Sequence, residues 1–426
     1  MKKEKPKILF LTHQFPRPTS GFGQRTRTFL RALSKEWGIT LVTRCPIDIK
    51  PEEVSDLEAL GCVVVTIPAS SFRWGGSLLK LMDSQNKLLR ALPLLFSRTP
   101  IFLNNNLFLR SDQLDAYLAL LKWDDFEIVH LERMYLANSV LSRIDDIQKA
   151  KVTMAMDLDE LESEVVARSL AYPSDSHSTV FGRFLRQRDL QRLRRYEADT
   201  IPRLDACTVS SDIEMQNLSR LGFSNKKEVI PNSVDTGHYA PNILKETKDS
   251  DILFVGQMSY SPNVDAVTYF VQKIFPSVLK AIPSARFFIV GQKPSEEVLK
   301  LHDGMRVIVT GEVPDTRVYH EKCAAIATPI RYGGGTRIKI LEAMAMGKAV
   351  VSTSIGAEGI PATHDKNIII ADHEDEFAAR CVKLLQDYPL RRAIGDQARE
   401  FVCKYFDNRL IEDRIRAYYA SIKEAG

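Results

Sequence analysis

The sequence lacks the cysteine patterns that mark small disulfide-bonded domains and structural zinc sites. It contains six cysteines, all widely separated, with no Cys-x-x-Cys pair and no Cys/His cluster: Cys45, Cys62, Cys207, Cys323, Cys381 and Cys403. Neither a disulfide framework nor a structural zinc site is therefore expected. This use of cysteine favours a reducing compartment.

Long apolar runs are also missing. The first one, Ile8–Leu11, is too short for the hydrophobic part of a secretory signal peptide, and no small-residue cleavage site follows it. No stretch approaches the roughly 20 apolar residues that a helix needs to span a bilayer. We therefore predict a cytoplasmic protein that at most lies peripherally against the inner membrane face.

The charge of the chain has little excess of either sign. Lysine and arginine total 58 and aspartate and glutamate 54, which leaves a formal net charge of +4. This excess is too small to indicate nucleic-acid binding, so no nucleic-acid partner is predicted, although it fits mild attraction to anionic substrates. Two basic segments, 72–110 and 181–203, could contact a membrane. The alternative, which we favour, is amphipathic helices packed on the core with their cations in water.

A dinucleotide-binding fingerprint is absent as well. No G-x-G-x-x-G pattern follows the first predicted strand of either half of the chain, which excludes a dehydrogenase interpretation.

What the chain does contain is an alternation of short β-rich runs with longer helical patterns, which is typical of parallel α/β sheets. Most of the runs are almost continuously apolar, as expected for strands covered on both faces. The predicted strands of the first half are Lys7–Thr12, Ile39–Thr43, Val63–Ile67, Glu127–Leu131, Val152–Met156 and Ala206–Ser210. Those of the second half are Asp251–Val255, Arg286–Val290, Arg306–Thr310, Ala324–Thr328, Ala349–Thr353 and Asn367–Ala371.

The length of 426 residues exceeds that at which one core usually stops growing, so two domains are expected. The strand series breaks at Ile230–Ser233, before a polar stretch that ends near Ser250. We predict a first domain over 1–230 and a second over 231–406, with a C-terminal helix in 407–426 packing back on the first. The fold class is α/β, with two facing doubly wound, Rossmann-like parallel-sheet domains. Ligands of such sheets bind at the carboxyl ends of the strands.

The most informative segment runs from Pro329 to Thr353. It predicts a strand, a glycine loop, a helix over about Thr336–Met346, a glycine stop and another strand. The three glycines Gly333, Gly334 and Gly335 let backbone N–H groups approach a ligand, and the helix start that follows them favours a phosphate. Thr336 is the predicted N-cap.

Two cations follow the glycine loop. Arg337 and Lys339 fall in the first turn of the predicted helix, where the helix dipole disfavours positive charge. This placement indicates an anionic ligand nearby, and Glu342 lies within reach of the ribose hydroxyls of a nucleotide. The alternative is a tight turn followed by an amphipathic helix with solvated basic residues.

The sequence GGGTRIKILEAMAMGKAVVST, which starts at Gly333, resembles the donor site of the group 1 glycosyltransferases, a large retaining family with the GT-B architecture. That family carries two glutamates in an E-x7-E motif. Glu342 takes the position of the second, which the resemblance implies binds the nucleotide ribose. The first, which contacts the transferred sugar, falls on Gly334, as in a subgroup whose motif reads GGGTRxKxLEAM. The similarity runs from about Gly21 to Glu400 and is strongest from about 251 to 360.

The resemblance implies a glycosyltransferase that moves a sugar from a nucleotide-sugar donor to a carbohydrate, lipid-linked or other acceptor. Transfer is expected with retention at the anomeric carbon, without a bound metal and without a cofactor other than the donor itself. Two alternatives remain open: a sugar-nucleotide 2-epimerase of the same architecture, and a non-catalytic nucleotide-sugar-binding scaffold.

The second domain also departs from the family at the phosphates. Gly256 matches the turn after the domain's first strand, but the arginine that follows it in the family falls on Gln257. The family's lysine region reads Ser-Pro-Asn here, so neither cation is present. Because a buried diphosphate without a cation is costly, we infer that Arg337 or Lys339 replaces them. The backbone near Val313 is implied to recognise the base.

In the first domain, the family has a glycine loop after the first strand that faces the donor diphosphate. Gly21 matches its first glycine, Phe22 replaces the second, and Gly23 follows. Arg25 either contacts a phosphate or caps a surface turn.

The family also has a histidine pair near a later strand end of the same domain. His130 keeps the first histidine, and Glu132 replaces the second, which lies nearer the reacting sugar. His130 is either catalytic or structural. Glu132 could accept a hydrogen bond from the donor sugar or act as a base toward the acceptor. The acidic cluster Asp157, Asp159 and Glu162 lies either at the cleft rim or at a helix N-terminus.

Overall fold

The computed structural model describes residues 5–73, 110–172, 180–241 and 250–423, and most of the predicted basic segment 72–110 lies outside them. The chain divides into two compact units. The first comprises residues 1–230 with 412–426, and the second comprises 231–411.

The first unit contains a seven-stranded parallel sheet with the strand order β3-β2-β1-β6-β7-β8-β9. Its strands are β1 (Lys7–Thr12), β2 (Gly38–Cys45), β3 (Cys62–Pro68), β6 (Ile128–Glu132), β7 (Thr153–Asp159), β8 (Ala206–Val209) and β9 (Lys226–Val229). A separate antiparallel pair joins β4 (Phe72–Arg73) and β5 (Arg110–Ser111). The order reverses between β1 and β6, which makes their carboxyl ends the switch point of the sheet.

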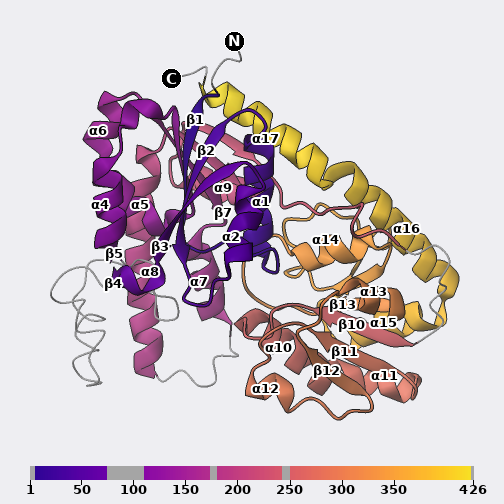
Figure 1. Cartoon of the computed structure of the whole chain (residues 1–426). Helices are drawn as coiled ribbons and strands as arrows, with labels where there is room; N and C mark the ends of the chain where they lie inside the picture. Colours follow the sequence, from indigo (N-terminus) through magenta and orange to yellow (C-terminus); the bar gives the residue numbers. More distant parts are fainter. Residues whose placement is uncertain (1–4, 74–109, 173–179, 242–249, 424–426) are drawn as a thin grey trace. The chain divides into compact units, whose positions relative to one another are not determined.

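Helices cover both faces of this sheet. They are α1 (Gly21–Leu33), α2 (Pro51–Glu58), α4 (Asp112–Leu120), α5 (Ala137–Leu141), α6 (Ile144–Lys149), α7 (Glu162–Ala171), α8 (Val180–Thr200), α9 (Asp212–Arg220) and α17 (Asn408–Lys423). Short 3-10 turns lie at Ala69–Ser71, Trp123–Asp125, Met134–Leu136 and Ile201–Arg203. Figure 1 shows α4, α5 and α6 on one side of the sheet and α1 on the other.

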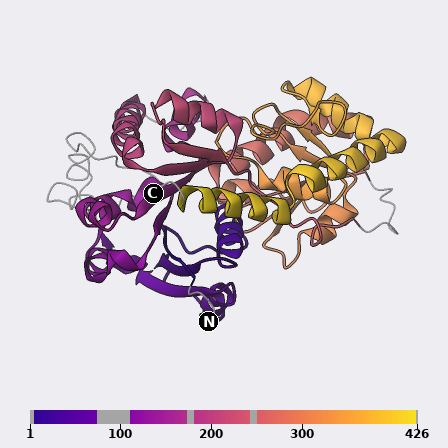
Figure 2. The ribbon, with the colours of Figure 1, turned by 90° about the horizontal axis from the view of Figure 1, so that it is seen from above.

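The C-terminal helix α17 packs on the first unit beside α1, as Figures 1 and 2 show. The ring of Tyr419 lies edge-on to that of Phe29 in α1. Glu412 pairs with Arg31 and Lys35, also from the region of α1. These contacts combine a buried aromatic ring with charged groups at the helix surface, so α17 belongs to the core of the first unit.

The second unit contains a six-stranded parallel sheet with the order β12-β11-β10-β13-β14-β15. Its strands are β10 (Asp251–Val255), β11 (Arg286–Val290), β12 (Val307–Gly311), β13 (Ala325–Thr328), β14 (Ala349–Ser352) and β15 (Ile369–Ile370). Its helices are α10 (Ser261–Tyr269), a π-helical turn (Phe270–Ile274), α11 (Phe275–Ala281), α12 (Glu296–Leu299), α13 (Arg317–Lys322), α14 (Ile338–Ala345), α15 (Glu374–Gln386) and α16 (Tyr388–Tyr405). The switch point lies between β10 and β13.

Alternate residues of the central strands pack into two separate hydrophobic clusters. Phe254 of β10 lies in one cluster with residues of α10 and α15, whereas Leu253 lies in the other with residues of α14. Both faces of the sheet are thus covered, which explains why its strands read as continuous apolar runs.

The predicted fold class of two doubly wound parallel-sheet units is confirmed, and each predicted strand is present with its ends shifted by at most three residues. The strand β9 was missed because its sequence Lys-Lys-Glu-Val has no apolar run. The predicted N-cap of α14 is wrong. The helix begins at Ile338 after Arg337, which keeps extended backbone and so is the N-cap instead of Thr336.

All six cysteines are free thiols. Within the described ranges, no helix is both long and apolar enough to cross a membrane.

Candidate functional site

The glycine loop of the second unit connects β13 to α14 at the switch point of its sheet. Gly333 and Gly335 have φ values of 106° and 72°, in the left-handed region that favours glycine. A Cβ on Gly333 would lie 3.1 Å from the Pro262 ring and 3.2 Å from Nη2 of Arg337. The loop therefore passes closely over the first turn of α10 and over the Arg337 side chain, with Gly334 buried between the other two glycines.

Buried polar atoms without partners lie directly after this loop. The Nε atom of Arg337 and the hydroxyl oxygen of Thr336 are both inaccessible to solvent and have no hydrogen-bond partner. Arg337 as a whole is 9% exposed. Buried polar groups are nearly always paired in folded proteins, so an unpaired guanidinium nitrogen beside a glycine loop indicates an anionic ligand.

The second cation, Lys339, reaches back to the turn after β10. Its Nζ atom lies 2.5 Å from the side-chain oxygen of Asn263, whose amide nitrogen donates to the backbone of Gln257. A Cβ on Gly256 would be 2.8 Å from the same Nζ atom. Burial, reinforced by the charge of Arg337, lowers the pKa of Lys339 to about 7. The structure thus brings Gly256, Gln257 and Lys339 together at one point.

Glu342 and Val313 lie near the same edge of the sheet. Glu342, in α14, is 7% exposed, and its carboxylate accepts a 2.9 Å hydrogen bond from the hydroxyl of Tyr239. Val313 is half-buried just after β12 and packs against the cluster that contains α14. The predicted donor-binding residues therefore occur at the carboxyl ends of β10, β12 and β13 or in α14.

In the first unit, Glu132 ends β6 in register with Thr12 of β1 and Asp157 of β7. Its side chain is buried, the hydroxyl of Thr26 donates to one carboxyl oxygen, and the other oxygen has no hydrogen-bond partner. Burial raises the pKa of Glu132 to about 8. The carboxyl group is therefore mainly protonated at neutral pH, a state in which it can donate a hydrogen bond.

Arg25 lies in the core and not on a surface turn. Its Nε and Nη2 atoms each lie 2.6 Å from a carboxylate oxygen of Asp157, and Nη1 donates to the backbone oxygen of Ile230 at 2.8 Å. Thr208 donates to the same carboxylate. Because these nitrogens bind protein groups, the alternative of a surface turn is wrong, and the arrangement does not favour phosphate contact.

His130 is fully buried in the first unit. Its Nδ1 atom lies 2.5 Å from the hydroxyl of Tyr419 in α17, and its ring packs 4.0 Å from that of Phe10. Burial, with the nearby charge of Arg25, lowers the pKa of His130 to about 3, so the imidazole is neutral. These contacts join the sheet to α17.

Gly21 and Gly23 open helix α1, whose N-cap is Ser20. A Cβ on Gly23 would lie 1.9 Å from the backbone oxygen of Arg17, so only glycine fits there. Gly21 is exposed at the first helical position.

The acidic cluster divides into two sets. Asp157 binds Arg25, whereas Asp159 and Glu162 bind Arg133 at 2.8 and 2.9 Å. Arg133 and Asp159 both have positive φ values, 61° and 57°, although neither is glycine. Such strained backbone is found where a site is held in a fixed shape.

Residues 249–387, in the second unit, match the family model described as "Glycosyl transferases group 1". This segment is therefore similar to the group 1 glycosyltransferases. The match covers the switch point between β10 and β13, the glycine loop and α14.

Two curated relatives are similar to part of the chain. One is the "Uncharacterized 44.6 kDa protein in cps region" of Klebsiella pneumoniae, 28% identical over 174 residues, which are 39% of this chain and 45% of the relative. The other is one of the subunits of human phosphatidylinositol N-acetylglucosaminyltransferase, 29% identical over 150 residues, 33% of this chain and 29% of the relative. The similarity therefore spans less than half the length of either relative.

The fold of the whole chain is similar to solved structures. The crystal structure of Anabaena Alr3699/HepE in complex with UDP and glucose superimposes with a TM-score of 0.64, at 14% identity, over 98% of this chain and 100% of that chain. At this identity the likeness shows the fold alone, which is the GT-B fold of two parallel-sheet domains.

The sequence did not single out two residues that lie beside these sites. His13 follows β1 at the switch point of the first unit, lies against the rings of Phe22 and Tyr135, and has a buried Nδ1 atom without a partner. Burial and the charge of Arg133 hold its pKa well below its usual range. Its place directly after the first strand could have identified it. Tyr239 has no comparable signal, because its partner Glu342 is far along the chain.

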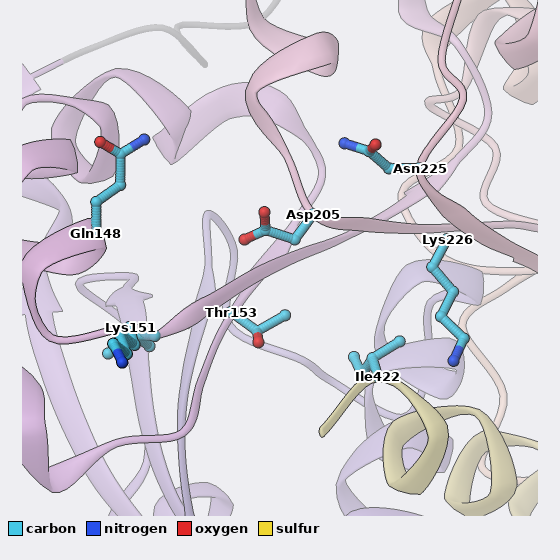
Figure 3. Close-up of a pocket in the computed structure, with 8 residues that line it drawn as sticks. Gln148, Lys151, Thr153, Asp205, Asn225, Lys226 and Ile422 are labelled. Atoms are coloured by element: carbon cyan, nitrogen blue, oxygen red, sulfur yellow. The ribbon is translucent and has the colours of Figure 1, made fainter. Parts of the chain in front are cut away.

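A separate pocket of about 460 Å³ lies at the other edge of the first sheet (Figure 3). It is lined by residues at the amino ends of β7, β8 and β9, among them Thr153, Asp205 and Lys226. Asp205 already accepts a hydrogen bond from the backbone of Met154, and Lys226 donates to that of Ser421. Ligands of parallel sheets bind at carboxyl ends, so we do not assign the donor to this pocket.

No group of three or more His, Cys, Asp and Glu side chains suited to hold a metal ion is found among the residues that the structure describes.

Proposed function

We propose that the chain is a glycosyltransferase that moves a sugar from a nucleotide-sugar donor to a carbohydrate, lipid-linked or other acceptor. The observation that carries the proposal is the buried, unpartnered Nε atom of Arg337 beside the glycine loop. A donor diphosphate placed at Gly333–Gly335 would pair this cation. It would also reach the backbone N–H groups at the start of α14.

The two cations after the loop take the place of the arginine and lysine that the family carries after β10. Lys339 supports this part of the proposal because its ammonium lies at Gly256 although it comes from α14. Charge that develops on the departing diphosphate would be stabilised by Arg337, Lys339 and the helix start. We propose that no bound metal or further cofactor takes part and that transfer retains the anomeric configuration. This site corresponds to the subgroup motif GGGTRxKxLEAM.

The ribose and base are assigned to neighbouring groups. Glu342 would accept hydrogen bonds from ribose hydroxyls, and the backbone near Val313 would bind the base. UDP is the first nucleotide to test, because the structurally similar Anabaena protein was solved with UDP and glucose.

The acceptor is assigned to the first unit. Glu132, His13 and the strained Arg133–Asp159 pair lie at the carboxyl ends of its strands, where a hydroxyl-bearing acceptor would meet two neutral groups and one ion pair. A protonated Glu132 suits hydrogen bonding to a sugar hydroxyl better than it suits the role of a base at neutral pH.

A peripheral membrane contact is one of two interpretations of the basic segment 181–203. Helix α8 presents the exposed residues Arg183, Phe184, Arg194 and Arg195, while Leu190 and Leu193 are buried. The buried leucines support the packed amphipathic helix that we favour. Co-sedimentation with anionic vesicles separates the two interpretations, since absence of binding excludes a membrane contact.

The assay that tests the function is turnover of a panel of UDP-, GDP-, ADP- and dTDP-sugars, with glycan and lipid-linked acceptors. A glycosyltransferase releases the nucleoside diphosphate and forms a glycoside. Formation of an epimer would instead identify a 2-epimerase, and binding without turnover would identify a non-catalytic scaffold. Repeating the assay with a chelator tests whether transfer is independent of metal.

A further inference from the structure

The hydroxyl of Tyr239 donates a 2.9 Å hydrogen bond to Oε1 of Glu342. The two residues are 103 positions apart, and Tyr239 belongs to the segment 231–241 that precedes the first strand of the second unit. Glu342 is the carboxylate that the proposed function assigns to the ribose. A side chain from outside the family motif therefore contacts the most important carboxylate of the motif.

Several hydrogen bonds fix the segment that carries Tyr239. Its backbone oxygen accepts from Nη1 of Arg399 at 3.1 Å, and Arg399 also donates to the backbone of Ala345 at the end of α14. The neighbouring backbone oxygen of His238 accepts from Arg317 at 3.0 Å. Because Arg399 holds both this segment and α14, the position of the phenol relative to Glu342 is fixed from both sides.

In this pair the phenol of Tyr239 donates the hydrogen bond and the carboxylate of Glu342 accepts it. Burial, followed by the charge of Glu342, holds the pKa of Tyr239 far above its usual range, so the phenol stays protonated and donates. Thr316 adds a hydrogen bond to the same phenol. A donor of this kind favours the ionised form of a buried carboxylate and restricts its rotation. An ionised carboxylate is in turn an acceptor suited to the hydroxyl donors of a ribose.

We propose that Tyr239 is a positioning residue that holds the Glu342 carboxylate ready for the ribose of a nucleoside diphosphate. The proposal rests on the proposed function and deepens it, because it makes the ribose hydroxyls the substrate groups through which Tyr239 acts. If Tyr239 only stabilised the fold, its substitution would change the affinity for every nucleotide equally, with or without ribose hydroxyls. A positioning tyrosine changes binding only when the ligand carries ribose hydroxyls.

The test compares Tyr239→Phe with the wild type by isothermal titration. The ligands are UDP, GDP and ADP, each beside its 2′,3′-dideoxy analogue. The substitution removes one hydrogen bond to a charged group, so the ribonucleotide that binds the wild type should bind the variant roughly tenfold more weakly. Binding of its dideoxy analogue should change by less than about twofold.

Two matched variants complete the design. Tyr319→Phe removes the hydroxyl of another half-buried tyrosine of the second unit, and it should change neither affinity. Glu342→Gln should weaken binding of the ribonucleotide. Adding Tyr239→Phe to this variant should cause little further loss of affinity, because the two groups act through one contact.

The outcomes separate the two proposals. If Tyr239→Phe weakens the binding of the ribonucleotide and of its dideoxy analogue equally, or weakens neither, the role of Tyr239 is overturned. The nucleotide binding of the wild type is not affected by that result. Additive effects of Tyr239→Phe and Glu342→Gln overturn it as well. If the wild type binds none of the three diphosphates, the proposed function fails and this inference fails with it.

Discussion

The ammonium group of Lys339 lies 2.5 Å from the side-chain oxygen of Asn263 and 4.2 Å from the centroid of the Phe254 ring. Lys339 belongs to the first turn of α14, whereas its two partners belong to α10 and β10. The lysine therefore crosses the switch point of the sheet and places its charge at Gly256. In this way α14 supplies a cation to the turn after β10, which has no lysine or arginine of its own.

The first prediction concerns the pH dependence of donor binding. Burial, reinforced by the charge of Arg337 and opposed by that of Glu342, lowers the pKa of Lys339 to about 7. A bound diphosphate favours the ammonium form and raises this pKa, so binding takes up a proton above pH 7. The affinity for a nucleotide-sugar should be constant below about pH 7 and fall up to tenfold per unit above it. Isothermal titration with a nucleotide-sugar at several pH values between 6 and 9 measures this affinity.

The matched variant for this prediction is Lys339→Arg. Arginine keeps its charge over the whole range, so the variant should lose the pH dependence while retaining binding. An equally steep fall in the affinity of Lys339→Arg would assign the titration to another group.

The second prediction concerns the buried pair of Arg25 and Asp157, whose side chains are 3% and 1% exposed. Removing one partner leaves a buried charge without compensation, which costs about 3–5 kcal/mol. Arg25→Met should therefore lower the urea midpoint of the first unit strongly. The double variant Arg25→Met/Asp157→Asn should lose much less than the sum of the single losses.

An exposed pair of the same unit is the control. Arg414 and Glu228 are 45% and 36% exposed, and Arg414→Ala should cost no more than about 1 kcal/mol. Similar midpoints for Arg25→Met and Arg414→Ala would contradict the assignment of Arg25 to the core.

The third prediction concerns Glu132, whose pKa is raised by burial from an ordinary value of 4.5 to about 8. The folded state holds a proton that the unfolded state has lost between these two pH values. The stabilising contribution is thus complete below about pH 4.5 and is lost as the pH rises to about 8, at up to about 1.4 kcal/mol per pH unit. The difference in stability between wild type and Glu132→Gln should follow this course.

The exposed Glu58 of α2 supplies the comparison for Glu132. Glu58→Gln should leave the pH profile of unfolding unchanged. A Glu132→Gln profile parallel to that of the wild type between pH 4.5 and 8 would show that Glu132 is ionised in the folded protein.

The fourth prediction concerns Gly23 at the start of α1. A Cβ there would lie 1.9 Å from the backbone oxygen of Arg17. The backbone of Arg17 cannot move away from this Cβ unless the loop that carries it also moves. Gly23→Ala should cost about 1–3 kcal/mol. Gly38→Ala is the control, since its Cβ would meet nothing closer than 3.7 Å. Thermal unfolding of both variants checks the difference, and equal melting temperatures would show that the loop adapts.

The strands were predictable because they are buried on both faces, which makes their sequences continuously apolar. Strand β9 has a polar sequence and lies at the edge of its sheet, so no apolar run marked it. The start of α14 was misplaced because Thr336 is a good N-cap by residue type, whereas the loop stays extended through Arg337.

The side-chain partners of the sites were the least predictable part. The sequence identified Arg25, Lys339 and Glu342 as important, but their partners are 132, 76 and 103 residues away. Only the folded chain brings residues so far apart in the sequence together. Burial of Arg25, protonation of Glu132 and the contact with Tyr239 all depend on those long-range pairings.

The central claim is that Arg337 and the glycine loop hold the diphosphate of a nucleotide-sugar donor. Isothermal titration of wild type, Arg337→Ala and Arg392→Ala with UDP-, GDP-, ADP- and dTDP-glucose tests it most directly. Arg392 is an exposed arginine of the same unit, paired with Asp396. We predict that the wild type and Arg392→Ala bind at least one of these donors equally well, and that Arg337→Ala binds it at least about tenfold more weakly. Equal affinities for all three proteins, or no binding by the wild type, would contradict the claim.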